Sequence, residues 1–271
     1  MNNVLCVEAL TKSYSGKTVL NGVNLQVKKG ELLALLGTNG AGKTTMLECI
    51  EGLRNYDSGK VMISGKIGIQ LQSSSLPAHI RPMEAIRLFA KWNKVKINQG
   101  MLKIFEINKL ANKQYRVLSS GQKQRLHLVL ALLSDPDILF LDEPTAGLDV
   151  EGRITLHEQI RALKQLGKTI ILTSHDMAEV ESLCDRLAVL NNGVISFVGT
   201  LEELNRHIGK RLIISIQTNH GSEKHESYNL GKTLFALLQE YERQDITVLD
   251  IKIDHSSLEQ DFIELTRRDE T

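Results

Sequence analysis

The sequence predicts an α/β domain built around a parallel sheet, followed by a smaller α+β domain. Three continuous apolar runs, Leu32–Leu36, Ile138–Leu141 and Ile170–Leu172, are typical of strands that are buried on both faces of such a sheet. Helical stretches separate these runs, and strands that alternate with helices indicate an α/β architecture. The pattern changes near residue 210, where we expect the smaller domain to begin.

The first domain contains several helical stretches and one long insert without strand character. We expect helices over Thr45–Glu51, Gln122–Leu133, Glu151–Leu166 and Met177–Cys184. Residues from about 73 to 134 carry no strong strand signal, so they are predicted to form a mostly helical subdomain. Val23, Leu25 and Val27 alternate with polar residues, which predicts a strand with one exposed face.

The end of the first domain and the second domain have their own local signals. Asn191-Asn192-Gly193 between apolar stretches predicts a hairpin, and Thr200–Glu203 has capping-box spacing for a short helix. We therefore expect domains at residues 1–205 and 210–271. In the second we expect strands over Leu212–Gln217 and Ile246–Ile253, and helices over Lys232–Arg243 and Ser257–Arg267.

The bulk composition excludes some classes of function. Of the 271 residues, 42% are hydrophobic and 24% are charged, with a net charge of +1, which argues against nucleic acid as a partner. The apolar runs are too short to span a bilayer, and the first residues lack the features of a secretion signal. The cysteines, Cys6, Cys49 and Cys184, are odd in number and widely spaced, as expected of reduced residues in the cytosol.

Residues 37–44 match the phosphate-loop pattern G-x-x-x-x-G-K-[ST]. Glycines let the backbone wrap closely around phosphates, Lys43 adds a positive charge for the β- and γ-phosphates, and Thr44 offers a hydroxyl to Mg²⁺. The loop follows an apolar strand and precedes a helix, whose N-terminus attracts the same anion. We expect ATP to be bound by Gly37, Thr38, Asn39, Gly40, Ala41, Gly42, Lys43, Thr44 and Thr45.

Two acidic residues follow the second apolar run. Asp142 at the end of the strand is predicted to hold Mg²⁺, and Glu143 is predicted to polarise the attacking water as a general base. An acidic pair that only caps a strand is the alternative. The phosphate loop favours the catalytic interpretation, because ATP hydrolysis needs both sites.

The order of the motifs resembles that of the ATP-binding cassette (ABC) family over residues 4 to about 200. The resemblance rests on Leu118-Ser119-Ser120-Gly121-Gln122, Asp142-Glu143-Pro144-Thr145 and Ala146-Gly147-Leu148-Asp149. It implies a P-loop NTPase core of the ABC ATPase type with an antiparallel β subdomain and a helical insert. The small C-terminal α+β appendage is additional to this core.

The resemblance assigns the signature segment to a nucleotide held by a second subunit. Ser119, Gly121 and Gln122 match the usual L-S-G-G-Q pattern, whereas Ser120 stands where the middle glycine normally is. We expect slightly altered contacts there. Without the family, the segment would be interpreted as a helix N-terminus capped by serine. Asp149 is included among the residues expected to bind nucleotide.

Three further positions are assigned by the same resemblance. Tyr14 resembles the aromatic residue that stacks on adenine, although a half-buried strand tyrosine is the alternative. Gln72 resembles the glutamine that senses Mg²⁺ and the attacking water, with Gln70 as a near competitor. His175 follows a buried strand, where the family has a histidine that contacts the γ-phosphate; a structural histidine is the alternative.

The resemblance implies an ATPase that drives transport through separate polytopic membrane subunits. Residues 256–266 resemble the C-terminal tail of motor subunits from drug, antibiotic and bacteriocin exporters. We therefore expect an exporter motor at the cytoplasmic face of the cell membrane. It would pair with a second ABC ATPase subunit, either an identical copy or a related chain. A soluble ABC ATPase of the iron–sulfur assembly type, acting on a cytosolic partner, is the alternative.

Overall fold

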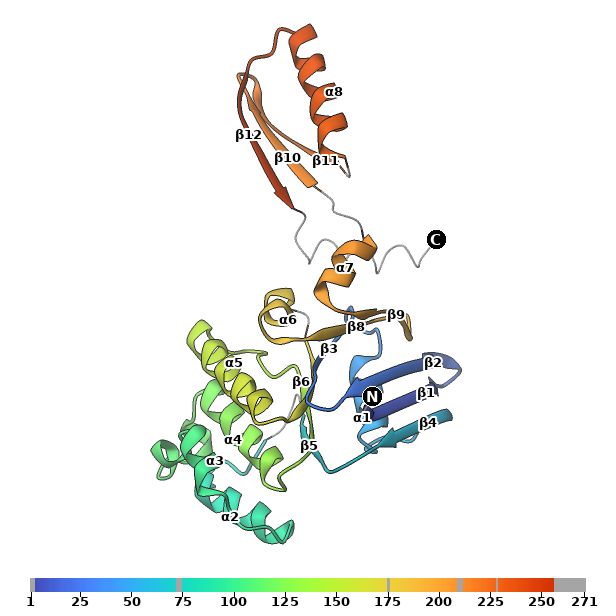
Figure 1. Ribbon diagram of the computed structural model, residues 1–271. Helices are drawn as coiled ribbons and strands as arrows, with labels where there is room; N and C mark the ends of the chain where they lie inside the picture. The colour runs from blue at the N-terminus through green and yellow to red at the C-terminus, as the bar shows by residue number, and fades with distance from the viewer. Residues whose placement is uncertain (1–2, 72–74, 175, 209–211, 228, 256–271) are drawn as a thin grey trace. The chain divides into compact units, whose positions relative to one another are not determined.

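The computed structural model describes residues 3–71, 75–174, 176–208, 212–227 and 229–255 (Figure 1). The chain divides into two compact units, Met1–Val198 and Gly199–Thr271, and each is described by itself. In the described parts of the chain, no helix is both long and apolar enough to cross a membrane.

The first unit is organised around a six-stranded sheet with the order β5-β6-β7-β3-β8-β9. The pairs among β5, β6, β7, β3 and β8 are parallel, so these five strands end at the same edge of the sheet. Every residue of β3, β6 and β7 is buried, as their apolar sequences predict. The bounds are β3 Leu32–Leu36, β5 Ile67–Gln70, β6 Ile138–Asp142, β7 Thr169–Thr173, β8 Arg186–Asn191 and β9 Val194–Gly199.

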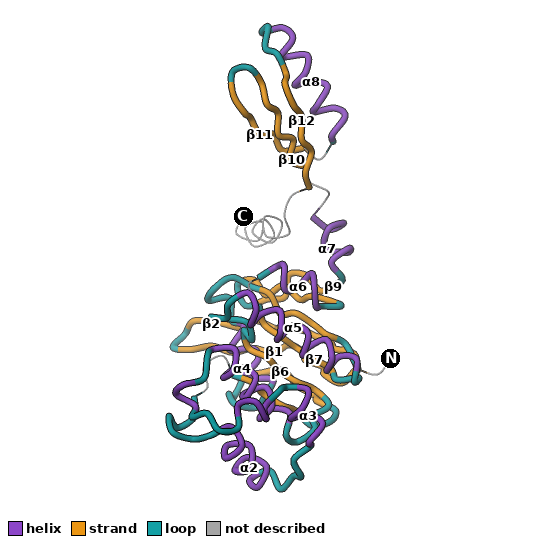
Figure 2. The backbone as a smooth tube through the Cα atoms, turned by 90° about the vertical axis from the view of Figure 1, so that its left-hand side faces the viewer, coloured by secondary structure: helices purple, strands orange, loops and turns teal. Residues whose placement is uncertain are grey.

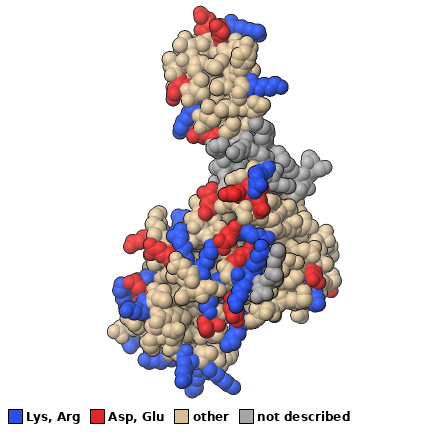
Figure 3. Space-filling view, viewed as in Figure 1, with Lys and Arg blue, Asp and Glu red and all other residues tan. Residues whose placement is uncertain are grey.

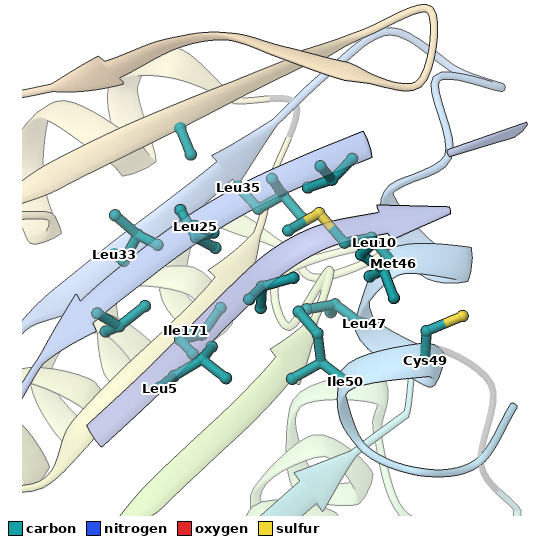
Figure 4. Packing of buried hydrophobic residues seen from close by; sticks show 14 of the residues in the cluster. Leu5, Leu10, Leu25, Leu33, Leu35, Met46, Leu47, Cys49, Ile50 and Ile171 are labelled. Atoms are coloured by element: carbon teal, nitrogen blue, oxygen red, sulfur yellow. The ribbon is translucent and has the colours of Figure 1, made fainter. Parts of the chain in front are cut away.

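A second, antiparallel sheet of the order β2-β1-β4 packs its apolar side toward the first. Its strands are β1 Asn3–Tyr14, β2 Lys17–Lys28 and β4 Ser58–Ile63. The helix α1 (Lys43–Ile50) shares one hydrophobic core with both sheets, in which Leu5, Met46 and Ile171 are buried (Figure 4). This core holds the N-terminus of α1 at the end of β3, where the phosphate-loop motif lies.

Helices cover the other face of the parallel sheet (Figure 2). The insert contains α2 Pro82–Trp92, α3 Gln99–Ile104, two short 3₁₀ helices (Ile107–Leu110 and Tyr115–Val117) and α4 Ser120–Leu132. Within the insert, α2 packs on α4, and α4 packs on β5 and on α5 (Val150–Gln165). The helix α6 (Met177–Leu183) follows β7 and also contacts α5.

The second unit begins with α7 (Leu201–Ile208), whose first turn has the expected capping box. Thr200 N–H donates to Glu203 Oε2 at 2.8 Å, and Glu203 N–H donates to Thr200 Oγ1 at 3.2 Å. A three-stranded antiparallel sheet of the order β11-β10-β12 follows, with α8 (Leu230–Arg243) packed on Ile214 and Ile216. Its strands are β10 Leu212–Thr218, β11 Gly221–Ser227 and β12 Val248–His255.

The predicted α/β fold with a parallel sheet is confirmed, and the described part of the insert contains helices and no strand. The expected hairpin joins β8 and β9 around Asn192-Gly193. The strand β11 was missed because Gly221–Ser227 is polar throughout; it forms by pairing with β10 along its whole length. The helix predicted at Ser257–Arg267 lies outside the described residues.

Candidate active site

The phosphate-loop residues occupy the turn between β3 and α1. Gly37 directly follows β3, and a Cβ on Gly37 would lie 2.6 Å from the carbonyl oxygen of Leu190, so only glycine fits. Gly42 caps α1 with φ +104°, a conformation that other residues rarely adopt. The helix α1 has no acidic residue in its first turn. Its N-terminal N–H groups therefore suit an anion from outside the chain.

The side chain of Lys43 curls back over this loop. Its Nζ donates to the carbonyl oxygen of Gly37 at 2.7 Å and to that of Thr38 at 3.2 Å. Burial lowers the pKa of Lys43, and the nearby carboxylates of Glu143 and Asp142 oppose this shift. The ammonium group thus lies between the loop and the two acidic residues.

Asp142 ends β6 as a buried carboxylate held by two hydroxyl groups. Thr173 Oγ1 donates to its Oδ1 at 2.6 Å, and Thr44 Oγ1 donates to its Oδ2 at 3.3 Å. Burial raises the pKa of Asp142, and the hydrogen bond from Thr173 opposes the shift. A carboxylate beside a threonine hydroxyl fits Mg²⁺, which prefers oxygen ligands and completes its shell with water and phosphate oxygens.

Glu143 has a strained backbone at the end of the same strand. Its φ is +46°, which is uncommon for a residue other than glycine, and its N–H donates to Thr173 Oγ1 at 2.8 Å. Thr173 therefore contacts both acidic residues. Thr173 was not predicted as a site residue, although it stands as a hydroxyl residue at the end of an apolar strand.

The signature segment forms the N-terminus of α4. Ser119 Oγ accepts from Gln122 N–H, and Gln122 Oε1 accepts from Ser119 N–H, each at 3.3 Å, in a capping box. These residues, with Ser120 and Gly121, line a hollow of about 210 Å³ together with Asp149 at the N-terminus of α5. Among the described residues, none of the phosphate loop lines this hollow.

Tyr14 is the last residue of β1, and its side chain is partly exposed. Lys12 Nζ lies 5.2 Å from the centroid of its ring, and the guanidinium carbon of Arg54 lies 5.4 Å from it. The ring therefore interacts with two cations.

Gln72 and His175, both expected in the site, lie outside the described residues. Gln70, the competitor of Gln72, ends β5 with its side chain buried and with neither amide atom hydrogen-bonded. It lines a cavity of about 230 Å³ with Phe89 of α2 and His127 of α4.

Comparison with known proteins identifies the class to which this fold and site belong. A sequence model described as "ABC transporter" matches residues 20–146. The Nod factor export ATP-binding protein I of Ralstonia nicotianae is 35% identical over 75% of this chain and 69% of its own length. The chain therefore belongs to the ABC transporter family, as an ATP-hydrolysing subunit of a transporter.

Other relatives are named for resistance or for import. The linearmycin resistance ATP-binding protein of Bacillus subtilis is 29% identical over 98% of this chain and 99% of its own length. A spermidine/putrescine import ATP-binding protein of Mycoplasma mycoides is 37% identical, and this chain spans 63% of its length.

Solved structures of the family share the fold. The ATP-binding subunit of an ABC transporter is 29% identical, with a TM-score of 0.68 over 75% of this chain and 92% of that one. A dimeric ATP-binding cassette in a post-hydrolysis state, bound to ADP and Pi, is 26% identical with a TM-score of 0.65 over 73% of this chain and 98% of that one.

Proposed function

We propose that this chain is the ATP-hydrolysing motor of an ABC exporter whose membrane subunits are separate polypeptides. The assignment of ATP hydrolysis rests on one cluster at the carboxyl edge of the parallel sheet, formed by Lys43, Thr44, Asp142 and Thr173. The likeness to the Nod factor export protein supports the exporter direction. The likeness to the linearmycin resistance protein agrees with export as a route to resistance, and it covers nearly the whole chain, including the second unit. The spermidine/putrescine importer matches 75% of the chain.

In this proposal the residues of one chain bind and orient MgATP. The loop Gly37–Gly42 and Thr45 surround the phosphates, Lys43 neutralises their charge, and Thr44 and Asp142 hold Mg²⁺. The metal, when bound, stabilises charge on the transferred phosphoryl group. Tyr14 stacks on adenine.

The remaining groups of the site prepare the attacking water. Glu143 takes a proton from this water as the general base. Gln72 and His175 orient the water. Gln72 also contacts the metal, and His175 also contacts the γ-phosphate. We assign the roles of these two residues from the family resemblance.

We further propose that two subunits complete each site. Ser119, Gly121, Gln122 and Asp149 line a hollow that the phosphate loop does not share, as expected if they contact a nucleotide on a second subunit. The dimeric relative with ADP and Pi supports this pairing. Ser120, in place of glycine, adds a small side chain to the same hollow.

The helical insert is the proposed contact with the membrane subunit, at the cytoplasmic face of the membrane. On α2, Leu88 and Trp92 are 54% and 79% exposed and lie one turn apart on the same face. Figure 3 shows lysine and arginine side chains at the lower edge of the molecule, where Figure 1 places α2. Aromatic residues, tryptophan among them, are enriched at protein-binding surfaces. Residues 76–94 would therefore receive a short helix of the membrane partner.

Replacing Glu143 with glutamine tests the paired-site mechanism. Glu143→Gln removes the carboxylate but leaves Lys43, Thr44 and Asp142 intact, so ATP should still bind while hydrolysis stops. The ATP-bound variant should accumulate as a dimer in light scattering, whereas ADP should leave monomers. Adding Ser119→Arg should prevent this dimer by placing a bulky side chain in the shared site.

The matched control is Lys43→Ala, which should lose ATP binding and therefore stay monomeric with either nucleotide. Hydrolysis at the wild-type rate in Glu143→Gln would show that Glu143 is not the base. An ATP-bound Glu143→Gln variant that remained monomeric, even with its native partner, would contradict the paired site. Copurification with a polytopic membrane protein supports the transport role, and a cytosolic scaffold as partner contradicts it.

A further inference from the structure

A buried carboxylate outside the phosphate-binding residues connects several segments of the site. The side chain of Glu179 in α6 is only 1% exposed. A buried carboxylate is costly unless its oxygens accept hydrogen bonds, and Glu179 has three such partners. Ser174 Oγ donates to Oε2 at 2.5 Å, Thr145 Oγ1 donates to Oε2 at 3.1 Å, and His157 Nε2 lies 3.3 Å from Oε1.

Two of the three partners of Glu179, Thr145 and Ser174, lie on the segments that carry the proposed catalytic groups. Thr145 is two residues after Glu143, in a turn where Ala146 N–H donates to the carbonyl oxygen of Glu143 at 3.1 Å. Ser174 directly precedes His175 in the sequence. A single oxygen of Glu179 therefore joins the segment after β6 to the segment after β7.

Neighbouring contacts hold Glu179 itself in place. Asp176 caps α6 through its Oδ1, which accepts from Ala178 N–H at 2.9 Å, and its Oδ2 pairs with Arg153 of α5 at 3.2 Å. Asp176 N–H also donates to Ser174 Oγ at 3.0 Å. The carboxylate of Glu179 thus lies on a helix whose first turn is fixed to α5 and to Ser174.

We propose that Glu179 is a positioning residue for ATP hydrolysis, which holds the segment after Glu143 and the residue that precedes His175 in one arrangement. This inference rests on the proposed roles of those two residues. Glu179 acts through the hydroxyls of Thr145 and Ser174 and needs no contact with the nucleotide. Because general-base catalysis requires the base and the water to be accurately placed, a shift of about 1 Å can lower the rate by about 100-fold.

The proposed role depends on a hydrogen-bond acceptor and not on negative charge. In Glu179→Gln, the amide oxygen can accept from Ser174 and Thr145, while the amide nitrogen faces His157. In Glu179→Ala, both hydroxyls lose their common acceptor, so the two segments are no longer joined. The glutamine variant should therefore rescue what the alanine variant loses.

Steady-state ATP hydrolysis by the full chain tests the proposal. Glu179→Ala should lower kcat at least 10-fold with KM and the ATP Kd within about twofold of wild type, and Glu179→Gln should retain most of kcat. Ser174→Ala and Thr145→Val should each lower kcat several-fold. Adding Ser174→Ala to Glu179→Ala should cause little further loss, because the bond is already absent.

Glu31→Gln is the control for loss of stability without loss of positioning. Glu31 is also buried, and its carboxylate pairs with Arg186 at 2.8 Å and accepts a hydrogen bond from Lys28 N–H at 2.7 Å. Glu31 directly precedes β3, so it lies at the opposite end of that strand from the phosphate loop. This variant should lower the melting temperature and leave kcat unchanged.

Wild-type kcat in Glu179→Ala would overturn the proposal, and so would equal losses in the alanine and glutamine variants. If Glu179→Ala does not fold, the kcat values of Ser174→Ala and Thr145→Val test the positioning role instead. Wild-type kcat in both variants would refute it. Glu143→Gln distinguishes a failure of the positioning role from a failure of the proposed ATPase mechanism. If it stops hydrolysis while Glu179 variants remain fully active, only the positioning inference is wrong.

Discussion

At the residue scale, the hydroxyl of Thr173 gives the two adjacent acidic residues different environments. It donates to Asp142 Oδ1 and accepts from the N–H of Glu143. Asp142 is thereby held inside the sheet edge near Thr44, while the positive φ of Glu143 turns the chain away from the strand. Asp142 can thus offer its carboxylate to a metal ion, and Glu143 can offer its carboxylate to water.

Glu51, one residue beyond α1, is a second buried acid near this site. Its Oε2 has no hydrogen-bond partner, and burial, followed by the charges of Asp142 and Glu48, raises its pKa to about 7. A folded-state pKa above the unfolded value of 4.5 means that the folded protein binds the extra proton. The stability should therefore fall as the pH rises from 4.5 to 7.

We expect Glu51→Gln to be more stable than wild type at pH 8, by about 3 kcal/mol, because it removes a buried charge. The difference should vanish near pH 4, where Glu51 is protonated in both states. Thermal unfolding at several pH values, without Mg²⁺ or nucleotide, measures this. Glu158→Gln is the control, since Glu158 is exposed on α5 and should give no gain at pH 8. An equal effect of Glu51→Gln at pH 4 and pH 8 would contradict the assignment.

At the element scale, the β8–β9 hairpin attaches the antiparallel sheet to the parallel one. Gly193 has φ +77°, and its carbonyl oxygen accepts from Asn21 N–H of β2 at 2.8 Å. A Cβ on Gly193 would lie 2.4 Å from the carbonyl oxygen of Val19. The turn therefore needs glycine for its conformation and also for the close approach of β2.

Gly193→Ala should destabilise the first unit more than Gly167→Ala does. Gly167 has a similar φ of +80°, but an added Cβ would meet nothing within 4 Å. Both substitutions cost about 1 kcal/mol of backbone strain, and Gly193→Ala should cost about 1–3 kcal/mol more, because β2 must move. Denaturant unfolding of the two variants measures the difference. Equal losses would show that β2 does not constrain the turn.

At the scale of the whole molecule, each unit has its own hydrophobic core. The core around α1 is formed by residues between Val4 and Val198, and the core under α8 by residues between Ile214 and Ile251. All residues proposed to bind or hydrolyse ATP precede residue 199. We propose that the second unit is regulatory or supports dimerisation.

Removing residues 211–271 should therefore preserve ATP binding. The Kd of the truncated chain for ATP, measured by calorimetry, should stay within a few-fold of the full-length value, since the first core remains complete. Lys43→Ala in the truncated chain provides the non-binding control. A folded truncated chain that bound no ATP would show that the second unit is part of the nucleotide site.

Local pattern predicted most strands and helices of the first unit, because apolar runs and capping residues act over a few neighbours. The run Leu32–Leu36 matches β3 residue for residue. By contrast, β11 has no apolar pattern and exists because β10 offers it a hydrogen-bonding partner. Pairing between strands is a long-range property, so sequence periodicity did not predict it.

The sequence by itself determined the phosphate loop, the acidic pair and the family, because these depend on residue types at fixed spacing. Only the tertiary structure decided which side chains from distant segments meet. Thr173 lies 31 residues from Asp142, and Glu179 lies 34 residues from Thr145. Such contacts form because parallel strands end at one edge of the sheet, which brings the segments after β6 and β7 together.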